Sequence, residues 1–197
     1  AFPFAGGSTF SYQKIFDDDV ITLDYPGRGA KIDEPFATSI ENLITHLLPE
    51  TLSLIAKYPN YILYGHSMGA LVAYLMTHKI VELSQTLPQK LVVSGYKGPL
   101  YKRANRLSKL PEHQFWERLN ELGGMPNTLN DYPELKELFL PILKADFTLL
   151  ENYEPQPKNK LSIPIDVFYG DQENITAKEI ISWELESTVR VTVEKFQ

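Results

Sequence analysis

The pentapeptide at residues 65–69, Gly-His-Ser-Met-Gly, constrains the fold more than any other part of the sequence because of the segments on either side of it. The apolar run at 61–64 predicts a buried strand before it, and the largely apolar run at 70–76 predicts a helix after it. A Gly-x-Ser-x-Gly string in that context is typical of a nucleophile elbow, a strained turn that presents a serine hydroxyl. Ser67 is therefore predicted to be the attacking group.

Short apolar runs alternate with helical patterns along the chain, which predicts an α/β fold with a mostly parallel, doubly wound sheet. Nearly continuous apolar runs are typical of central strands buried on both faces, and they occur at 20–25, 61–64, 91–93 and 165–169. The run at 189–193 alternates and predicts a strand nearer the edge. Apolar residues recur at helical spacing from Ile40 to Ile55, and Pro49 is expected to kink or restart that helix.

The segment 96–159 has no convincing strand and contains two helical stretches, each with a proline near its first turn, at Pro111 and Pro133. We expect this segment to be a helical lid inserted into a single domain that spans 1–197. The two stretches carry apolar stripes, Phe115, Leu119 and Leu122 in the first and Leu135, Leu138, Phe139, Ile142 and Leu143 in the second. Ordinary packing on the core would explain most of these residues equally well.

Two backbone amides are candidates for stabilising an oxyanion. The N–H of Met68 lies at the predicted start of the helix after the elbow, where it can bind developing negative charge. A second donor is expected from the loop at residues 4–8, in which two glycines allow an amide to point inward and Ala5 adds little bulk. On its own, the Gly-Gly-Ser part of this loop indicates only a flexible turn. His66, inside the elbow, is expected to be structural.

The predicted strand at 165–169 leads into an acidic loop that offers Asp171 and Glu173 as the acid of a catalytic triad. The chain order of such a triad is Ser, acid, His, but all four histidines, at 46, 66, 78 and 113, precede this loop. We expect the catalytic histidine just beyond Gln197. The alternatives are an inactive chain or a lid histidine, such as His113, that reaches the site.

Composition excludes several classes of protein. The 197 residues carry a formal charge of −6 and no Lys/Arg-rich run, which argues against nucleic-acid binding. The absence of cysteine excludes disulfides, thiolate metal sites and a cysteine nucleophile, and it is compatible with the cytoplasm. No membrane span or signal peptide is expected. A docking patch for an acidic partner could come from Lys97, Lys102, Arg103, Arg106 and Lys109, although solvated loop charges explain these residues as well.

The sequence resembles the type II thioesterases that accompany polyketide and nonribosomal peptide synthetases, over essentially its whole length. The motifs that carry the resemblance are the opening residues 2–8, the Pro-Gly-Arg-Gly turn at 26–29, the elbow, Val-Ser-Gly at 93–95, Leu-Gly-Gly-Met-Pro at 122–126, Leu-Lys-Ala-Asp at 143–146, and Tyr-Gly-Asp at 169–171 with Trp183 downstream. Their order and spacing are more specific than any one motif.

The resemblance implies an α/β-hydrolase fold and an editing enzyme without a cofactor. Such an enzyme hydrolyses acyl or aberrant groups from the phosphopantetheine arm of acyl or peptidyl carrier proteins, and we expect it to be monomeric. By position, Ser67 would be the nucleophile, and the amides of Ala5 and Met68 the oxyanion hole. Glu173 occupies the place of the usual aspartate, so Asp171 stays an alternative acid and Asp146 a weaker third. Both termini are expected to be clipped, with Phe196-Gln197 just before the family's histidine.

Three other interpretations stay open from the sequence. The chain could be an α/β-hydrolase that acts on oxygen esters, or a chain-releasing thioesterase domain from a larger synthetase. It could also be a non-catalytic binding protein that kept the fold, since the histidine is missing and glutamate replaces the usual aspartate. The opening motif and the lid favour the editing enzyme.

Overall fold

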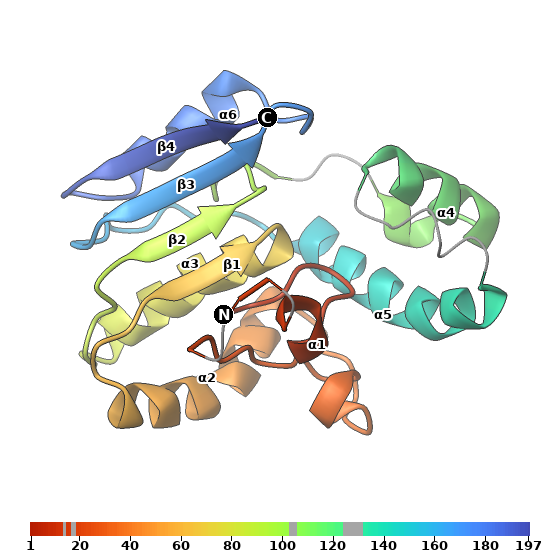
Figure 1. Cartoon of the computed structure of the whole chain (residues 1–197), viewed down its shortest axis with the longest axis horizontal. Coiled ribbons are helices and arrows are strands. Elements are labelled where there is room, and N and C mark those ends of the chain that lie inside the picture. The colour runs from red at the N-terminus through yellow and green to blue at the C-terminus, as the bar shows by residue number, and fades with distance from the viewer. Residues whose placement is uncertain (14, 17–18, 103–105, 124–131) are drawn as a thin grey trace.

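A four-stranded parallel sheet forms the centre of the computed structural model, which describes residues 1–197 apart from 14, 17–18, 103–105 and 124–131 (Figure 1). The strands follow one another across the sheet in chain order, as β1 (Leu63–His66), β2 (Leu91–Ser94), β3 (Ile165–Gly170) and β4 (Val191–Phe196). Because every pair is parallel, all the carboxyl ends lie at one edge of the sheet. The predicted edge strand at 189–193 is confirmed as β4, two residues further along.

Two helices cover the sheet next to the elbow. α3 (Met68–Glu82) packs on β1 and β2, and its residues are buried almost throughout, as predicted for the apolar run after the elbow. α2 (Ile40–Lys57) lies against α3 and is capped by Ser39, whose hydroxyl accepts the Asn42 N–H. Pro49 does not restart α2, because buried apolar side chains before and after the exposed proline hold both halves of the helix to the core.

The central strand predicted at 20–25 is wrong. The segment is extended but forms no strand, because its ladder to the N-terminal residues is too short: Ala1 donates to the Ile21 carbonyl, and the Leu23 N–H donates to the Ala1 carbonyl. The N-terminal residues in turn pair with β1 at one bridge, between Phe2 and Gly65.

Burial on both faces, predicted for the central strands, does not hold for β1 and β2. Their residues alternate between buried and half-buried. The buried side faces α3, since a Cβ placed on Gly65 would meet backbone atoms of that helix. Tyr64 and Val92, on the other side, line an open groove of about 650 Å³ beside the N-terminal residues.

The predicted lid helices are present as α4 (Glu112–Glu121) and α5 (Pro133–Asn152), which extend beyond the carboxyl ends of the strands (Figure 1). Pro111 directly precedes α4 and Pro133 is the first residue of α5, as expected. A second apolar cluster joins the two helices through Leu107, Phe115, Trp116, Leu119, Leu143 and Phe147. Leu122, Leu135 and Leu138, assigned to the apolar stripes, are instead exposed. The lid boundaries, 96 and 159, stay a prediction.

Shorter elements complete the described chain. They are α1 (Thr9–Tyr12), α6 (Ala177–Ile181) and the 3-10 helices η1 (Gly29–Lys31), η2 (Leu107–Lys109) and η4 (Ser182–Leu185). Within the described ranges, no helix combines the length and apolarity needed to cross a membrane.

Candidate active site

Ser67 occupies a strained turn at the carboxyl end of β1. Its φ of 53° and ψ of −117° lie outside the regions that a serine normally adopts. The Ser67 N–H donates to the Ser94 carbonyl at the end of β2, at 2.8 Å, and α3 begins with the next residue. The side chain is half-buried rather than sealed in the interior, so the predicted nucleophile is positioned to meet a substrate.

The two glycines of the elbow are required by backbone packing. A Cβ on Gly65 would lie 2.0 Å from the Gly69 carbonyl oxygen, and one on Gly69 would lie 2.0 Å from the Phe2 carbonyl oxygen. The first contact closes the turn around Ser67, as predicted for small residues in this motif. The second brings the start of α3 against the N-terminal residues, which lead directly into the candidate oxyanion loop.

Residues 4–7 form a tight turn in this loop. The Gly7 N–H donates to the Phe4 carbonyl at 2.8 Å, and Gly6 has a φ of +80°, as a type II turn requires at its third residue. Because a trans peptide points its C=O and N–H in opposite directions, the Phe4 carbonyl directed into the turn leaves the Ala5 N–H directed out of it.

The Ala5 amide has no hydrogen-bond acceptor within the described part of the chain. Met68 is the first residue of α3, so its N–H lacks an acceptor inside the helix and lies at the positive end of the helix dipole. These are the two amides predicted for the oxyanion hole. Contact between Gly69 and Phe2 links their two segments.

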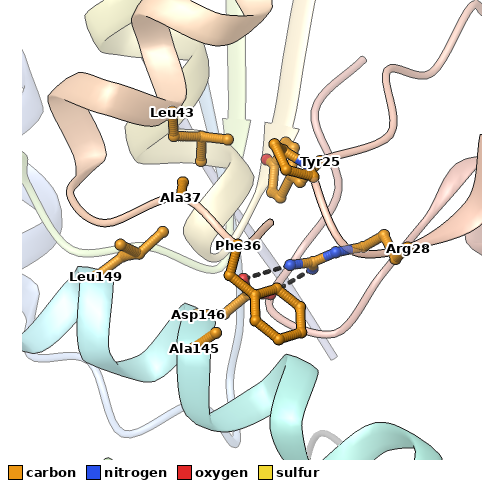
Figure 2. Close-up of a pocket in the computed structure, with 9 residues that line it drawn as sticks. Tyr25, Arg28, Phe36, Ala37, Leu43, Ala145, Asp146 and Leu149 are labelled. Carbon is orange, nitrogen blue, oxygen red and sulfur yellow. Dashed lines mark hydrogen bonds and ion pairs between the residues drawn. The ribbon is translucent and has the colours of Figure 1, made fainter. Parts of the chain in front are cut away.

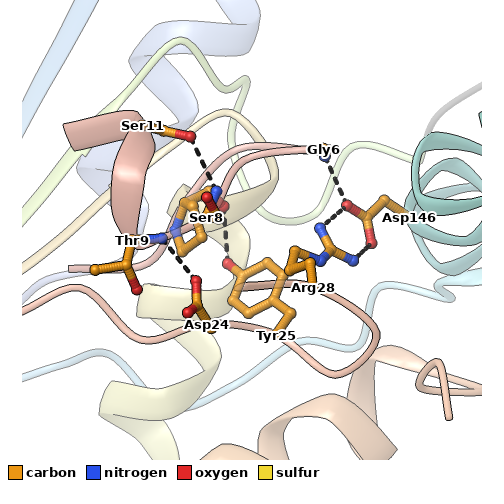
Figure 3. A network of polar contacts seen from close by, with 9 residues as sticks. Gly6, Ser8, Thr9, Ser11, Asp24, Tyr25, Arg28 and Asp146 are labelled. Carbon is orange, nitrogen blue, oxygen red and sulfur yellow. Dashed lines mark hydrogen bonds and ion pairs between the residues drawn. The ribbon is translucent and has the colours of Figure 1, made fainter. Parts of the chain in front are cut away.

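A buried ion pair lies behind the turn and joins it to the lid (Figures 2 and 3). Arg28 donates from both terminal nitrogens to Asp146 of α5, at 2.5 and 2.6 Å, and Asp146 Oδ2 also accepts the Gly6 N–H at 2.8 Å. Asp146 is 1% exposed and Arg28 4%. The Asp146 carboxylate is therefore committed to these partners, which removes the argument for it as a third candidate acid.

Asp24 and Tyr25 hold backbone groups that flank the turn, and Asp24 also binds η1 (Figure 3). Asp24 accepts the N–H groups of Thr9 and Ala30, at 2.6 and 2.9 Å, and the Tyr25 hydroxyl donates to the Pro3 carbonyl at 2.8 Å. Burial, reinforced by Asp146, raises the pKa of Tyr25 well above its ordinary value, so Tyr25 stays a donor.

The two candidate acids differ in their surroundings. Asp171 is exposed, and its N–H donates to the Phe196 carbonyl of β4. The Glu173 side chain is directed back toward the ends of the strands, where its Oε1 would lie 3.4 Å from a Cβ placed on Gly95. Its Oε2 is buried and has no hydrogen-bond partner among the described residues. Glu173 therefore offers a carboxylate oxygen that an imidazole N–H could satisfy.

The His66 side chain extends from the elbow toward this acid, since a Cβ on Gly95 would lie near both His66 and Glu173. Its Nδ1 is 2.9 Å from Ser94 Oγ, which is also 3.0 Å from the Tyr64 hydroxyl. Burial lowers the pKa of His66, while the Glu173 charge opposes that shift. A neutral ring fixed by Ser94 agrees with the structural role predicted for His66.

The remaining histidines lie in other environments. His46 pairs with Glu34 at 2.8 Å, His78 packs edge-on against Tyr74 in α3, and His113 is exposed on α4. In the described ranges, no group of three or more potential metal-ligating side chains is found.

The predicted docking patch is partly neutralised. Lys97 pairs with Glu179 at 3.6 Å, and Lys102 pairs with Glu154. Arg106 and Lys109 are exposed. Arg103 and the end of the Leu-Gly-Gly-Met-Pro motif, at 124–126, lie outside the described residues.

Comparisons with known proteins cover the whole chain. The family model described as "Thioesterase domain" matches residues 1–197. The "Probable anguibactin biosynthesis thioesterase AngT" of Vibrio anguillarum is 34% identical over 193 residues, which span 93% of this chain and 76% of the relative. ClbQ from the colibactin NRPS/PKS pathway has a TM-score of 0.87 at 29% identity, over 99% of this chain and 84% of that one. RedJ, a thioesterase from the prodiginine biosynthetic pathway in Streptomyces coelicolor, has a TM-score of 0.89 at 26% identity, over 98% and 75%.

Proposed function

This chain belongs to the thioesterase family and has its α/β-hydrolase fold, and we propose that it hydrolyses acyl or peptidyl thioesters on the phosphopantetheine arm of carrier proteins. The observation that carries the proposal is the strained, half-buried Ser67 at the end of β1, directly before the Met68 amide at the start of α3. The similar proteins named above come from anguibactin, colibactin and prodiginine biosynthesis, which supports an editing role in an assembly line of this kind.

In the first step, Ser67 Oγ attacks the thioester carbonyl carbon while its proton passes to an imidazole. The carbonyl oxygen becomes an oxyanion, which the N–H groups of Ala5 and Met68 stabilise. Collapse of this intermediate breaks the carbon–sulfur bond, and the imidazolium returns its proton to the leaving thiolate. The acyl group is then held as an ester on Ser67.

In the second step, water gives a proton to the same imidazole and attacks the ester carbonyl carbon. The bond between this carbon and Ser67 Oγ then breaks, the imidazolium returns the proton to Ser67 Oγ, and the carboxylic acid is released. Glu173 is proposed to orient the imidazole through its unpartnered Oε2 and to stabilise its charged form. His46, His78 and His113 are placed elsewhere, and His66 is bonded to Ser94. We therefore do not assign the imidazole of this mechanism to any of these four histidines.

Replacement of the nucleophile tests the proposal directly. Ser67→Ala in the full-length protein should lower the hydrolysis of an acyl-carrier protein by at least about 10³-fold, because only the binding groups and oxyanion amides remain. The measurement is release of free acid from an acyl-phosphopantetheinyl carrier, with the matching oxygen ester as a second substrate. Unchanged hydrolysis would remove Ser67 from the mechanism, and a preference for the oxygen ester would favour an esterase.

A matched pair of variants separates the two candidate acids. Glu173→Gln should lower kcat by about 10²-fold or more, since the amide cannot stabilise an imidazolium as a carboxylate does. Asp171→Asn changes an exposed carboxylate two residues away and should leave kcat within about twofold. The reverse order would assign the acid to Asp171.

A further inference from the structure

The buried ion pair between Arg28 and Asp146 is costly to desolvate, and a gain in folding stability alone does not explain its presence. Both groups are at least nine-tenths buried, and Arg28 Nε has no hydrogen-bond partner in the described part of the chain. Removing two charges from water offsets most of their attraction, so buried pairs are often replaceable by apolar residues without loss of stability. A function in positioning other groups would account for the pair.

The turn at residues 4–7, here called the oxyanion turn, contains one peptide that no hydrogen bond within the turn holds, and Asp146 binds that peptide. The Gly7 N–H fixes the Phe4–Ala5 peptide through the Phe4 carbonyl, whereas the next peptide is fixed by its Gly6 N–H, which donates to Asp146 at 2.8 Å. Without that acceptor, this peptide could flip and the turn would lose its polar anchor on α5, so the turn as a unit, with the Ala5 N–H that it carries, could shift relative to Ser67. Figure 3 shows Asp146 reaching Gly6 from α5, with Arg28 between Asp146 and Tyr25.

Arg28 holds the carboxylate in this orientation. Its two terminal nitrogens bind both Asp146 oxygens, and its guanidinium lies over the Tyr25 ring at 5.2 Å. A bidentate pair of this kind fixes direction as well as distance. Leu143, one turn earlier on α5, packs on the same turn, since a Cβ on Gly6 would lie 2.6 Å from its Cδ2. α5 thus contacts the turn through both a polar and an apolar side chain.

We propose that Asp146, clamped by Arg28, is a positioning residue that orients the oxyanion turn and couples it to the lid helix α5. This inference rests on the proposed function, because it needs the Ala5 amide to bind the oxyanion. The interaction matters most once charge develops on the carbonyl oxygen, so its loss lowers kcat rather than raising KM.

Two double variants isolate the hydrogen bond to Gly6. Arg28→Met with Asp146→Asn removes both charges but keeps an acceptor oxygen for the Gly6 N–H. Arg28→Met with Asp146→Leu also removes both charges, and its leucine has a shape similar to asparagine but no acceptor. We expect kcat on an acyl-carrier protein to be at least about tenfold lower in the leucine variant than in the asparagine variant. KM should agree within about twofold and Tm within a few degrees.

Equal kcat values in two folded double variants would overturn the proposal, as would a loss of kcat that follows Tm. If the leucine variant does not fold, Asp146→Asn alone decides: it should lower Tm yet keep most of kcat, and a tenfold loss of kcat would contradict the positioning role. Ser67→Ala, assayed in parallel, distinguishes the two hypotheses. An active Ser67→Ala variant refutes the mechanism, whereas an inactive one with equal double variants refutes only the role of Asp146.

Discussion

The elbow and the oxyanion turn supply complementary parts of one site, yet different forces hold them. At the elbow, backbone atoms of Gly65, Gly69 and Phe2 are in direct steric contact, and α3 buries the result. At the turn, a carboxylate on α5 accepts an amide 140 residues away in the chain, with an arginine from a third segment to hold it. The nucleophile is thus positioned by close packing and its oxyanion donor by charged hydrogen bonds. Substitutions should affect the two regions differently.

The largest effect is expected at the elbow. Gly65→Ala would place a methyl group 2.0 Å from a backbone oxygen that cannot move without displacing α3, so we expect a loss of more than about 4 kcal/mol in the free energy of unfolding. Gly123→Ala is the control for steric contact, because nothing lies within 4 Å of its Cβ position, although Gly123, unlike Gly65, has a positive φ of +71° that strains an alanine. It should cost only about 1–2 kcal/mol. Urea denaturation measures both, and similar losses would argue against close packing at the elbow.

The next effect is expected behind the turn. Arg28→Met leaves the Asp146 carboxylate buried without its ion-pair partner and should lower the free energy of unfolding by about 3–5 kcal/mol. The same denaturation series on Arg28→Met with Asp146→Leu should recover most of that loss. If the double variant were as unstable as the single one, the pair would be a stabilising contact and the contrast with the elbow would weaken.

A smaller loss of stability is expected when the pH is lowered and His78 of α3 becomes protonated. Burial, with the Lys158 charge, lowers the pKa of His78 to about 4, while Glu82 opposes the shift. The folded state therefore favours neutral His78, so its contribution to stability is complete above about pH 6.5 and is lost as the pH falls toward 4. Wild type should lose about 1–3 kcal/mol more than His78→Gln over this range, as measured by denaturation at several pH values. Parallel pH profiles for the two proteins would contradict this assignment.

The smallest effect is expected on the outer part of the lid. Leu138→Ser, at a side chain that is 53% exposed, should change the free energy of unfolding by less than about 0.5 kcal/mol. Leu143→Ala, on the same helix but buried against Gly6, should cost about 2–5 kcal/mol. Thermal denaturation of the two variants compares the exposed and buried parts of α5. A large loss at Leu138 would mean that it packs against another part of the protein.

The sequence predicts the locally packed elbow better than the long-range contacts that hold the turn at residues 4–7. The elbow depends on neighbouring residues, so Gly-x-Ser-x-Gly between a strand and a helix was enough to predict it. The segment at 20–25 has the apolar composition of a strand. It forms no strand because it makes too few backbone hydrogen bonds to neighbouring segments, and composition does not reveal their number. The partnership of Arg28 and Asp146 joins residues 118 apart, and nothing in either local motif specifies the other. Both residues lie in motifs that carry the family resemblance, but the motifs do not indicate that the two side chains form an ion pair.

The contact between Gly6 and Asp146 also sets an order of events during synthesis on the ribosome. The strands lie side by side in the order in which they are made, so the sheet can grow from β1 toward β4 as the chain emerges. The turn at residues 4–7 is made before all four strands, but its final orientation waits for an acceptor that is translated 140 residues later. A segment that leaves the ribosome before the sheet is therefore among the last to reach its working geometry.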